Sequence, residues 1–359
     1  MIDLFRPYVP AEAREAVDEV LRSRFIGQGP EVDRFEKLFC EKFNLPQYAV
    51  SVNSGTAALE TAYDLIGLKA GDEVISTPLT CSATNIPLIR RGVKIVWADI
   101  LPETLCIDPL DVRAKLTQRT KAVVQVHLGG IKADVGTLHV PVVSDAAQAL
   151  GIFTGDFTCC SFQAIKHITT IDGGMLVIHT KNRNNERDRN NARLLRWFGI
   201  DRAKKERNNW QAYRERKMTF DVQLAGHKRH MSDVSAVMGI VGLQKYSEMM
   251  EVRRSQFQVY RERLKDIDGI KLVDSLSNTY WLATVLVDRR DDFAKAMFEA
   301  NVDTNLVQLR NDIFKIFGGK RTDLPNMNSV EEKYISIPLG PHLSEDEINQ
   351  VCDAIEEGW

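Results

Sequence analysis

Residues 49–76 read AVSVNSGTAALETAYDLIGLKAGDEVIS, and this stretch decides the fold class. Its two ends, Ala49–Val52 and Glu73–Ser76, are short and apolar with β-branched residues, which predicts two strands. Ala57–Leu65 between them has the pattern of an amphipathic helix, and Ala70–Asp72 is a turn signal. A strand, a helix and a second strand in this order are typical of a mostly parallel sheet with helices on both faces.

The same alternation continues along the chain to Ile178. We expect further strands at Lys94–Trp97, Ala122–Val126, Val140–Ser144 and Met175–Ile178, and a further helix at Ala83–Arg91. Beyond this part the pattern predicts a long helix from Gly226 to about Leu264, short apolar runs at Gly269–Val273 and Trp281–Val287, and a final helix after the capping-box spacing of Ser344–Glu347.

A chain of 359 residues exceeds the usual size of one hydrophobic core, so we predict two domains. Residues 1–245 are expected to form a large α/β domain with an N-terminal arm, and residues 246–359 a smaller α+β domain. This division follows the change from strand–helix alternation to a long helix with short strands.

Composition favours an ordinary globular protein, with 44% apolar and 27% charged residues and a net charge of −2. The chain has no run of 18 apolar residues, and its N-terminus lacks a signal-peptide pattern, so no membrane association is expected. The six cysteines lack CxxC spacing, and the adjacent Cys159-Cys160 pair is poorly suited to a structural bridge. We therefore predict a reducing, cytoplasmic location.

Positive charge is concentrated in Lys181–Lys217, which holds 13 Lys or Arg against 5 Asp or Glu, with Trp197, Trp210 and Tyr213 between them. Two interpretations remain open: a solvated helix and loop surface, or a site for an anion such as a nucleic acid or a diphosphate. The rest of the chain carries −10, which disfavours a dedicated nucleic-acid binder.

Two clusters at predicted strand ends suit a phosphorylated pyridine ring. Near Gly55 and Thr56, a helix start offers unpaired N–H groups to a phosphate, although the motif taken alone is more often an ordinary N-cap. Asp145 ends a predicted strand, where a carboxylate can keep a ring nitrogen protonated or can simply cap a helix. Gln148 follows and can hydrogen-bond a ring oxygen or lie on a solvated surface.

The third cluster is Gly155–Gly174, GDFTCCSFQAIKHITTIDGG. Lysines are mostly exposed, but the apolar neighbours of Lys166 favour partial burial, which lowers the pKa of an amine and makes it a competent nucleophile. Ser161 is five residues away and suits the same phosphate. A Schiff-base lysine with a carboxylate such as Asp145 is what pyridoxal phosphate chemistry requires.

These motifs occur in an order that resembles the DegT/DnrJ/EryC1/StrS family of pyridoxal-phosphate-dependent sugar aminotransferases. The matching segments are Ser54–Leu59, Gly71–Pro78, Asp145–Ala149, Ser161–Gly174 and Gly226–Gly239, with shorter matches at Gly27–Glu36 and Ser336–Glu347. The resemblance spans nearly the whole chain. It implies the aspartate-aminotransferase scaffold (fold type I), with a seven-stranded sheet in the large domain.

The resemblance also implies a role for each matching residue. Lys166 is expected to form the internal aldimine and to carry the proton, and Asp145 to pair with the pyridinium. The other expected cofactor contacts are Gln148 at the ring oxygen and Gly55, Thr56 and Ser161 at the phosphate. The expected substrate contacts are Gln28, Arg196, Arg202, His227 and Arg310, of which Arg196 and Arg202 are assigned to a diphosphate on local charge alone.

A homodimer is implied too, in which Gly226–Met231 of one subunit completes the site of the other. Three departures from the family pattern bear on the site. Cys81 stands where an aromatic residue usually covers the ring, and a thiol supplies less contact area. His230 stands in place of a phosphate-binding asparagine, and Asp172 in place of a glutamate.

The sequence thus predicts an aminotransferase that moves an amino group, with L-glutamate as the expected donor, onto a keto group of a nucleotide-linked deoxysugar. Sugar dehydration is an alternative, because some relatives carry histidine in place of the lysine and His167 is adjacent here. A non-catalytic regulator with the same fold is another. A metal site at His227, His230 and His179 is disfavoured, because no Cys or carboxylate completes the set.

Overall fold

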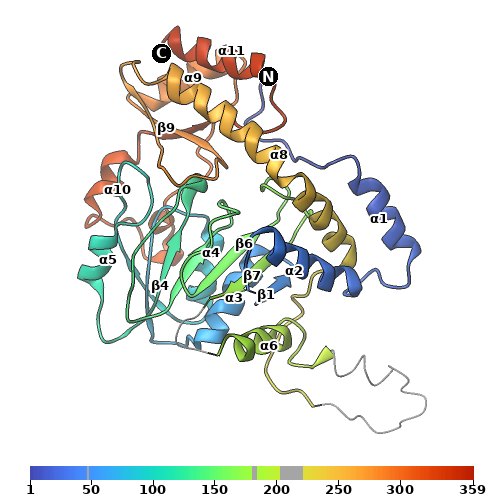
Figure 1. Ribbon diagram of the computed structural model, residues 1–359. Helices are drawn as coiled ribbons and strands as arrows, with labels where there is room; N and C mark the ends of the chain where they lie inside the picture. Colours follow the sequence, from blue (N-terminus) through green and yellow to red (C-terminus); the bar gives the residue numbers. More distant parts are fainter. Residues whose placement is uncertain (47, 180–183, 203–220) are drawn as a thin grey trace.

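The computed structural model describes residues 1–46, 48–179, 184–202 and 221–359, so Trp210 and Tyr213 of the basic stretch lie outside the described residues. A seven-stranded sheet forms the centre of the larger part of the molecule, in the order β1-β7-β6-β5-β4-β2-β3 (Figure 1). The strands are β1 Ala49–Val52, β2 Glu73–Ser76, β3 Lys94–Trp97, β4 Thr120–Val126, β5 Val142–Asp145, β6 Phe157–Ser161 and β7 Gly174–Ile178.

Strand directions in this sheet bring several chain segments to one edge. β7 is antiparallel to β1 and β6, and the remaining pairs are parallel, which confirms the expected mostly parallel sheet. Because β1, β5 and β6 point the same way, their carboxyl ends lie at the same edge, and β7 begins there. That edge therefore collects Asn53, Asp145, Ser161 and Gly174.

Helices cover both faces of the sheet. On one face α3 packs against Leu176 of β7, and on the other α2 and α8 pack against its neighbours Met175 and Val177. Successive strand residues point to opposite faces, so a strand covered on both sides is apolar throughout. The helices are α1 Ala13–Arg22, α2 Pro30–Lys42, α3 Gly55–Ile66, α4 Ser82–Arg90, α5 Pro109–Lys115, α6 Asn185–Leu195, α8 Asp233–Arg263, α9 Arg290–Glu299, α10 Pro325–Val330 and α11 Glu345–Glu356, with short 3₁₀ turns at Leu128–Gly130, Asn311–Ile313 and Lys315–Phe317.

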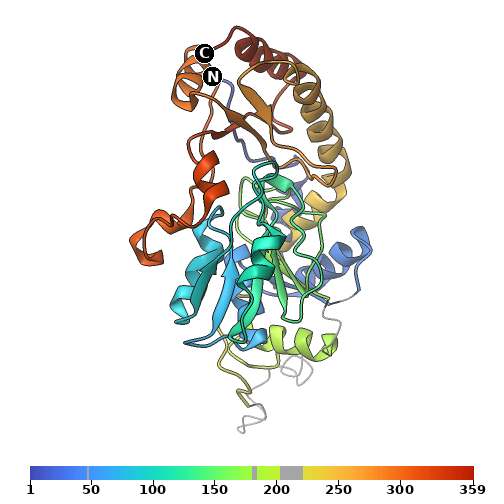
Figure 2. The ribbon, with the colours of Figure 1, turned by 90° about the vertical axis from the view of Figure 1, so that its left-hand side faces the viewer.

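A second, three-stranded antiparallel sheet lies beyond the first, in the order β10-β9-β8 (Figures 1 and 2). Its strands are β8 Ile270–Leu272, β9 Ala283–Val287 and β10 Tyr334–Ile337. One apolar core joins this sheet to α9, α11 and the C-terminal half of α8. The N-terminal segment pairs with the same part through a bridge between Ile2 and Val302, so both chain termini lie there.

Helix α8 connects the two sheets, and it is shorter than expected at its start. The helix begins at Asp233, not Gly226, because the Ser232 hydroxyl accepts the Ser235 N–H as an N-cap. Gly226 to Met231 instead runs beside residues 195–199 with backbone hydrogen bonds. The predicted domain boundary after residue 245 falls inside α8, so the division into domains stays a prediction. Within the described ranges, no helix is long and apolar enough to cross a membrane.

Candidate active site at the edge of the seven-stranded sheet

The turn from β1 into α3 packs tightly against the end of β6. Ser54 caps α3 by accepting the Ala57 N–H at 3.0 Å, so the N–H groups of Gly55 and Thr56 have no partner within the helix. A methyl group on Gly55 would lie 2.8 Å from Cβ of Ser161, and one on Gly174 would collide with the Ser54 carbonyl. Gly55, Thr56 and Ser161, hereafter the helix-start cluster, can hold an anion.

Asp145 ends β5 and is 5% exposed. Its Oδ2 accepts the Thr84 hydroxyl at 2.6 Å, and its Oδ1 accepts the Ala147 N–H at 3.0 Å. Burial raises the pKa of this carboxyl, while these two hydrogen bonds and the charge of Lys166 act in the opposite direction. A cation placed against Asp145 would therefore relieve the cost of burying its charge.

Lys166 lies in the loop between β6 and β7, which is anchored on both sides of it. Phe162 packs 5.4 Å from the Phe35 ring, and Ile168 contacts α8 at Gly242, where a methyl group would lie 2.5 Å from Ile168 Cγ2. Backbone bonds from Phe162 to Gly173 and from Thr170 to Phe162 close the loop. With these apolar side chains in the core, Lys166 remains partly buried on the other side of the loop.

The amine of Lys166 is the expected nucleophile, and its surroundings favour the neutral form. Burial lowers the pKa of Lys166 to about 8, and the charges of Asp145 and Cys81 partly oppose that shift. Nζ lies 4.0 Å from the centroid of the Trp281 ring. Lys166 and Asp145 thus interact electrostatically, as the sequence predicted for one site.

Gln148 and Cys81 lie on the segments that flank these groups. Gln148 is buried, and its Oε1 accepts the Gly129 N–H at 2.7 Å. That bond fixes the side-chain carbonyl and orients the amide N–H₂ as the donor that a ring oxygen would need. Cys81 is exposed at the N-cap position of α4, close enough to Lys166 to affect its pKa.

His167, the residue behind the dehydratase alternative, is buried and hydrogen-bonded to the backbone. It is 2% exposed, and its Nε2 donates to the Thr279 carbonyl at 2.8 Å. Burial lowers the pKa of His167 to about 3, so the ring is neutral at pH 7. Its position indicates a structural role, with Lys166 as the side chain at the site.

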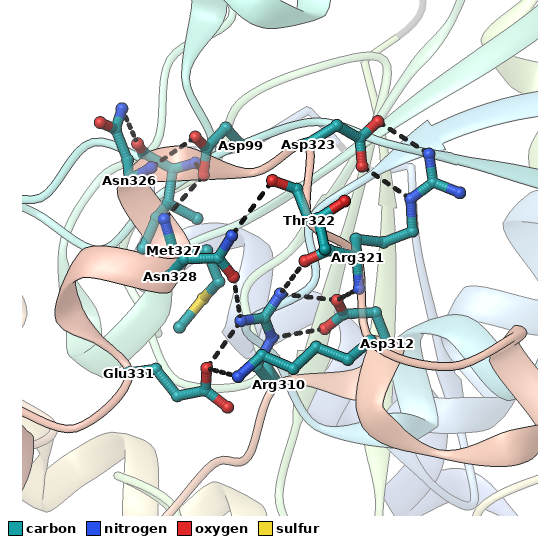
Figure 3. A network of polar contacts seen from close by, with 12 residues as sticks. Asp99, Arg310, Asp312, Arg321, Thr322, Asp323, Asn326, Met327, Asn328 and Glu331 are labelled. Carbon is teal, nitrogen blue, oxygen red and sulfur yellow. Dashed lines mark hydrogen bonds and ion pairs between the residues drawn. The ribbon is translucent and has the colours of Figure 1, made fainter.

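Arg310, expected to contact substrate, is instead bound within the protein (Figure 3). Its guanidinium is 1% exposed and pairs with Asp312 at 2.6 Å and Glu331 at 2.9 Å, with Asn328 as a third partner. The charge is therefore neutralised internally. The neighbouring Asn311 donates to the Thr80 carbonyl at 2.7 Å, which ties this segment to the chain beside Cys81.

Arg196, expected to contact a diphosphate, is paired within the protein and also lines the open cavity beside α6. It is 3% exposed and pairs with Glu36, and it donates to the Ser51 carbonyl at 2.9 Å. The charges of Arg196 and Arg193 bring the pKa of Glu36 down to about 2 against the effect of burial. Arg196 therefore links α2 to β1.

Gln28 and Arg202 meet at a separate open cavity of about 620 Å³ beside α6. Arg202 donates to the Gln28 carbonyl and lies 5.4 Å from the Trp197 ring. Gln28 Oε1 is buried, and it has no hydrogen-bond partner among the described residues. Lys166 is not among the residues that line this cavity.

His230 and His227 lie on the segment that precedes α8. His230 packs edge-on against Trp197 with 4.3 Å between ring centroids, and burial, together with nearby Arg202 and Lys228, lowers its pKa to about 4. His227 is exposed. In the described part of the chain, no three His, Cys, Asp or Glu side chains are grouped as metal ligands.

Comparison with known proteins identifies the fold and the family. The model of the DegT/DnrJ/EryC1/StrS aminotransferase family matches residues 7–356. The chain belongs to this family.

The relatives of this DegT-family chain include a curated protein and solved structures. The chain is 32% identical to the spore coat polysaccharide biosynthesis protein SpsC of Bacillus subtilis, over 98% of this chain and 95% of that protein. The crystal structure of the sugar aminotransferase CalS13 from Micromonospora echinospora superposes with a TM-score of 0.90 at 29% identity, over all of both chains. AtS13 from Actinomadura melliaura gives a TM-score of 0.90 at 32% identity, over 100% and 99% of the two chains. The fold type I architecture is thereby confirmed.

Pyridoxal 5′-phosphate is the cofactor of this family, and the residues at the sheet edge fit it. The helix-start cluster offers N–H groups and a hydroxyl to the phosphate, with no Cβ at Gly55 to fill the space. Asp145 is a buried carboxylate suited to a protonated ring nitrogen, and Lys166 is an amine suited to the aldehyde. Once bound, the cofactor supplies an electron sink for bonds at the carbon that carries the amino group.

Sequence reasoning missed two side chains that contact these groups. Thr84 donates a hydrogen bond to Asp145, from which it is 61 residues distant in the sequence. Trp281, which follows α8 in the sequence, contacts the amine of Lys166 with its ring. Thr84 lies within a predicted helix and Trp281 at the start of a predicted strand, where both look like ordinary core residues. Only the tertiary fold reveals their partners.

Proposed function

We propose that this DegT-family aminotransferase moves an amino group from L-glutamate onto a keto group of a nucleotide-linked deoxysugar. One observation carries the proposal: an amine with a lowered pKa, a buried carboxylate and an anion-binding helix start meet at one sheet edge. The name of SpsC refers to polysaccharide biosynthesis and that of CalS13 to a sugar substrate, which supports a sugar as the acceptor.

In this proposal Lys166 is the catalytic residue. It binds the cofactor through Nζ, and once free it takes the proton from Cα of the amino donor and later delivers a proton to the sugar carbon. A pKa of about 8 serves this role, because near pH 8 about half of the amine is neutral, against roughly 0.3% for a lysine at 10.5. Asp145 holds the ring nitrogen, and Gln148 donates to the ring oxygen.

The nucleotide is proposed to contact the cavity beside α6. Gln28 Oε1 is a buried acceptor with no hydrogen-bond partner in the described ranges, and a nucleoside N–H or hydroxyl would satisfy it. Arg202 lines the same cavity and is proposed as the diphosphate contact. Arg202→Glu should weaken binding of the nucleotide sugar at least tenfold, and an unchanged Kd rules that contact out.

A homodimer with shared sites completes the proposal. Ile171 is 63% exposed in the loop that carries Lys166, and Phe198 and Val222 are exposed beside the segment that holds His230. Apolar side chains in these places suit a subunit interface. His227 and His230 would then serve the site of the partner, with His230 near the phosphate. The cytoplasmic location stays a prediction, for cell fractionation to test.

A spectroscopic titration tests the reaction itself. Protein loaded with pyridoxal phosphate should lose its visible absorbance band on addition of L-glutamate, and a panel of nucleotide-linked keto deoxysugars should restore it, with the aminated sugar detected by mass spectrometry. Lys166→Ala should show neither change, whereas the exposed-lysine control Lys69→Ala should behave as wild type. A sugar product that has lost a hydroxyl and gained no nitrogen would identify a dehydratase. A visible absorbance band that no amino donor changes would indicate a regulator.

A further inference from the structure

Trp281 is an aromatic partner of the Lys166 amine. It lies just before β9, in the part of the chain beyond α8, and is 1% exposed. Its ring centroid is 4.0 Å from Lys166 Nζ, and its Nε1 donates to the carbonyl of the adjacent Ile165 at 3.0 Å. The tryptophan therefore contacts both the catalytic side chain and the backbone that carries it.

The Trp281 ring is held firmly in this position. The backbone N–H groups of Trp281 and Leu282 donate to the Gly129 carbonyl at 3.1 Å, and Arg253 donates to the Trp281 carbonyl at 3.1 Å. The Phe5 ring packs 5.6 Å from the indole. A second bond, from His167 to the Thr279 carbonyl, joins the same two segments on the other side of Lys166.

A cation over an indole face is stabilised by the negative π surface, most strongly where water is excluded. Burial acts in the opposite direction on the Lys166 amine, which loses hydration when it is charged. The other groups that act on this amine are the carboxylate of Asp145 and the thiol of Cys81, and the ring of the adjacent His167 is neutral. The indole of Trp281 differs from Asp145 in that it stabilises the ammonium form of Lys166 without carrying a charge itself.

We propose that Trp281 is a positioning residue that receives the side chain of Lys166 after its free amine has taken a proton, and stabilises the ammonium there until the proton is delivered. The inference rests on the proposed role of Lys166. Because Trp281 belongs to the part of the chain beyond α8, the resting position of the lysine depends on how that part docks on the seven-stranded sheet.

The test measures how fast cofactor-free protein captures pyridoxal phosphate as a function of pH, because only the neutral amine adds to the aldehyde. We expect the midpoint of this profile to fall by about half to one pH unit in Trp281→Leu, where the π face is lost. Trp281→Phe retains a ring and should show less than half of that shift. Trp97→Phe, a buried tryptophan packed on Phe317 away from the lysine, should leave the midpoint unchanged.

A midpoint that is unchanged or raised in Trp281→Leu overturns the inference. Thermal unfolding checks that each variant is folded, and Trp281→Met replaces the leucine variant if that one is not. Lys166→Ala separates the two proposals. If Lys166→Ala captures the cofactor like wild type, the proposed function fails; if it does not, and Trp281→Leu matches wild type, the role of Trp281 alone fails.

Discussion

Burial acts on the two central residues of the site in ways that suit each to a different partner. It lowers the pKa of Lys166 to about 8 and raises that of Asp145, so each residue is driven toward its neutral form. For Lys166 the neutral form is the reactive one. For Asp145 the neutral form is unproductive, and the Thr84 hydroxyl at 2.6 Å opposes it.

Replacement of Thr84 should therefore shift the pH dependence of cofactor binding. Thr84→Val removes a donor to the Asp145 carboxylate, so the pKa of Asp145 rises further. The ionised form, needed to hold a ring N–H⁺, is lost as pH falls through that pKa. Affinity for pyridoxal phosphate should accordingly decline at a higher pH in Thr84→Val than in wild type, as measured by fluorescence titration at several pH values.

Thr84→Ser is the matched control, because it retains the hydroxyl and should follow the wild-type profile. Coincident profiles for valine and wild type would mean that Thr84 does not support the charge on Asp145. The sequence could not supply this residue. Asp145 is predictable from its place after a predicted strand and Lys166 from its apolar neighbours, whereas the Thr84 contact depends on how the tertiary fold brings α4 to the end of β5.

At the scale of elements, strands were more predictable than helix starts. β1, β2 and β3 begin and end at the predicted residues; β1 and β2 are buried throughout, whereas β3 is an edge strand that is exposed at Lys94. β6, with its central Thr-Cys-Cys, carries too little of an apolar signal to be distinguished. The start of α8 was misplaced because the apolar pattern does not reveal that Gly226–Met231 pairs with residues 195–199.

The β1–α3 turn is the element on which phosphate binding should depend most. In Gly55→Ala the new methyl group would lie 2.8 Å from Ser161 Cβ, so the start of α3 and the end of β6 must separate. We expect a loss of about 1–3 kcal/mol in the free energy of unfolding. Affinity for pyridoxal phosphate should fall at least tenfold, because the separated N–H and hydroxyl groups no longer converge on one phosphate.

Gly27→Ala is the control for this experiment, because nothing lies within 4 Å of the added methyl group. Calorimetry gives stability and a spectroscopic titration gives cofactor affinity for both variants. If Gly55→Ala binds pyridoxal phosphate with wild-type affinity, the helix-start cluster does not bind the phosphate, whatever the effect of the substitution on stability.

At the scale of the whole molecule, charge was the least reliable signal in the sequence. Arg196 belongs to the basic stretch that suggested an anion site, yet it is paired with the buried carboxylate of Glu36. Arg310, another expected substrate contact, is paired with Asp312 and Glu331. A sequence lists charges without their partners, and here the partners Glu36 and Glu331 lie 160 and 21 residues away. Among the expected substrate contacts, Gln28, Arg196 and Arg202 line one cavity, and the guanidinium of Arg196 is paired there with Glu36.

The network around Arg310 should act on stability. Arg310→Ala would leave the carboxylate of Asp312, 0% exposed, without its guanidinium partner. Removal of one member of a buried pair costs about 3–5 kcal/mol, so thermal unfolding should occur several degrees lower. Arg321→Ala removes an exposed pair with Asp323 beside the same network and should change the unfolding temperature little. Equal effects of the two variants would contradict a structural role for Arg310.

A homodimer in which His230 serves the site of the partner subunit can be distinguished by experiment from one in which His230 serves its own subunit. Lys166→Ala should be inactive, and His230→Asp should be nearly so, because a carboxylate in place of His230 repels the phosphate bound to the partner. Co-expressed, the two chains form mixed dimers in which Lys166 of one chain and His230 of the other meet at one intact site. Random pairing then restores about a quarter of wild-type activity. If His230 served its own chain, each site of a mixed dimer would contain one defect, and the mixture would stay as inactive as its components.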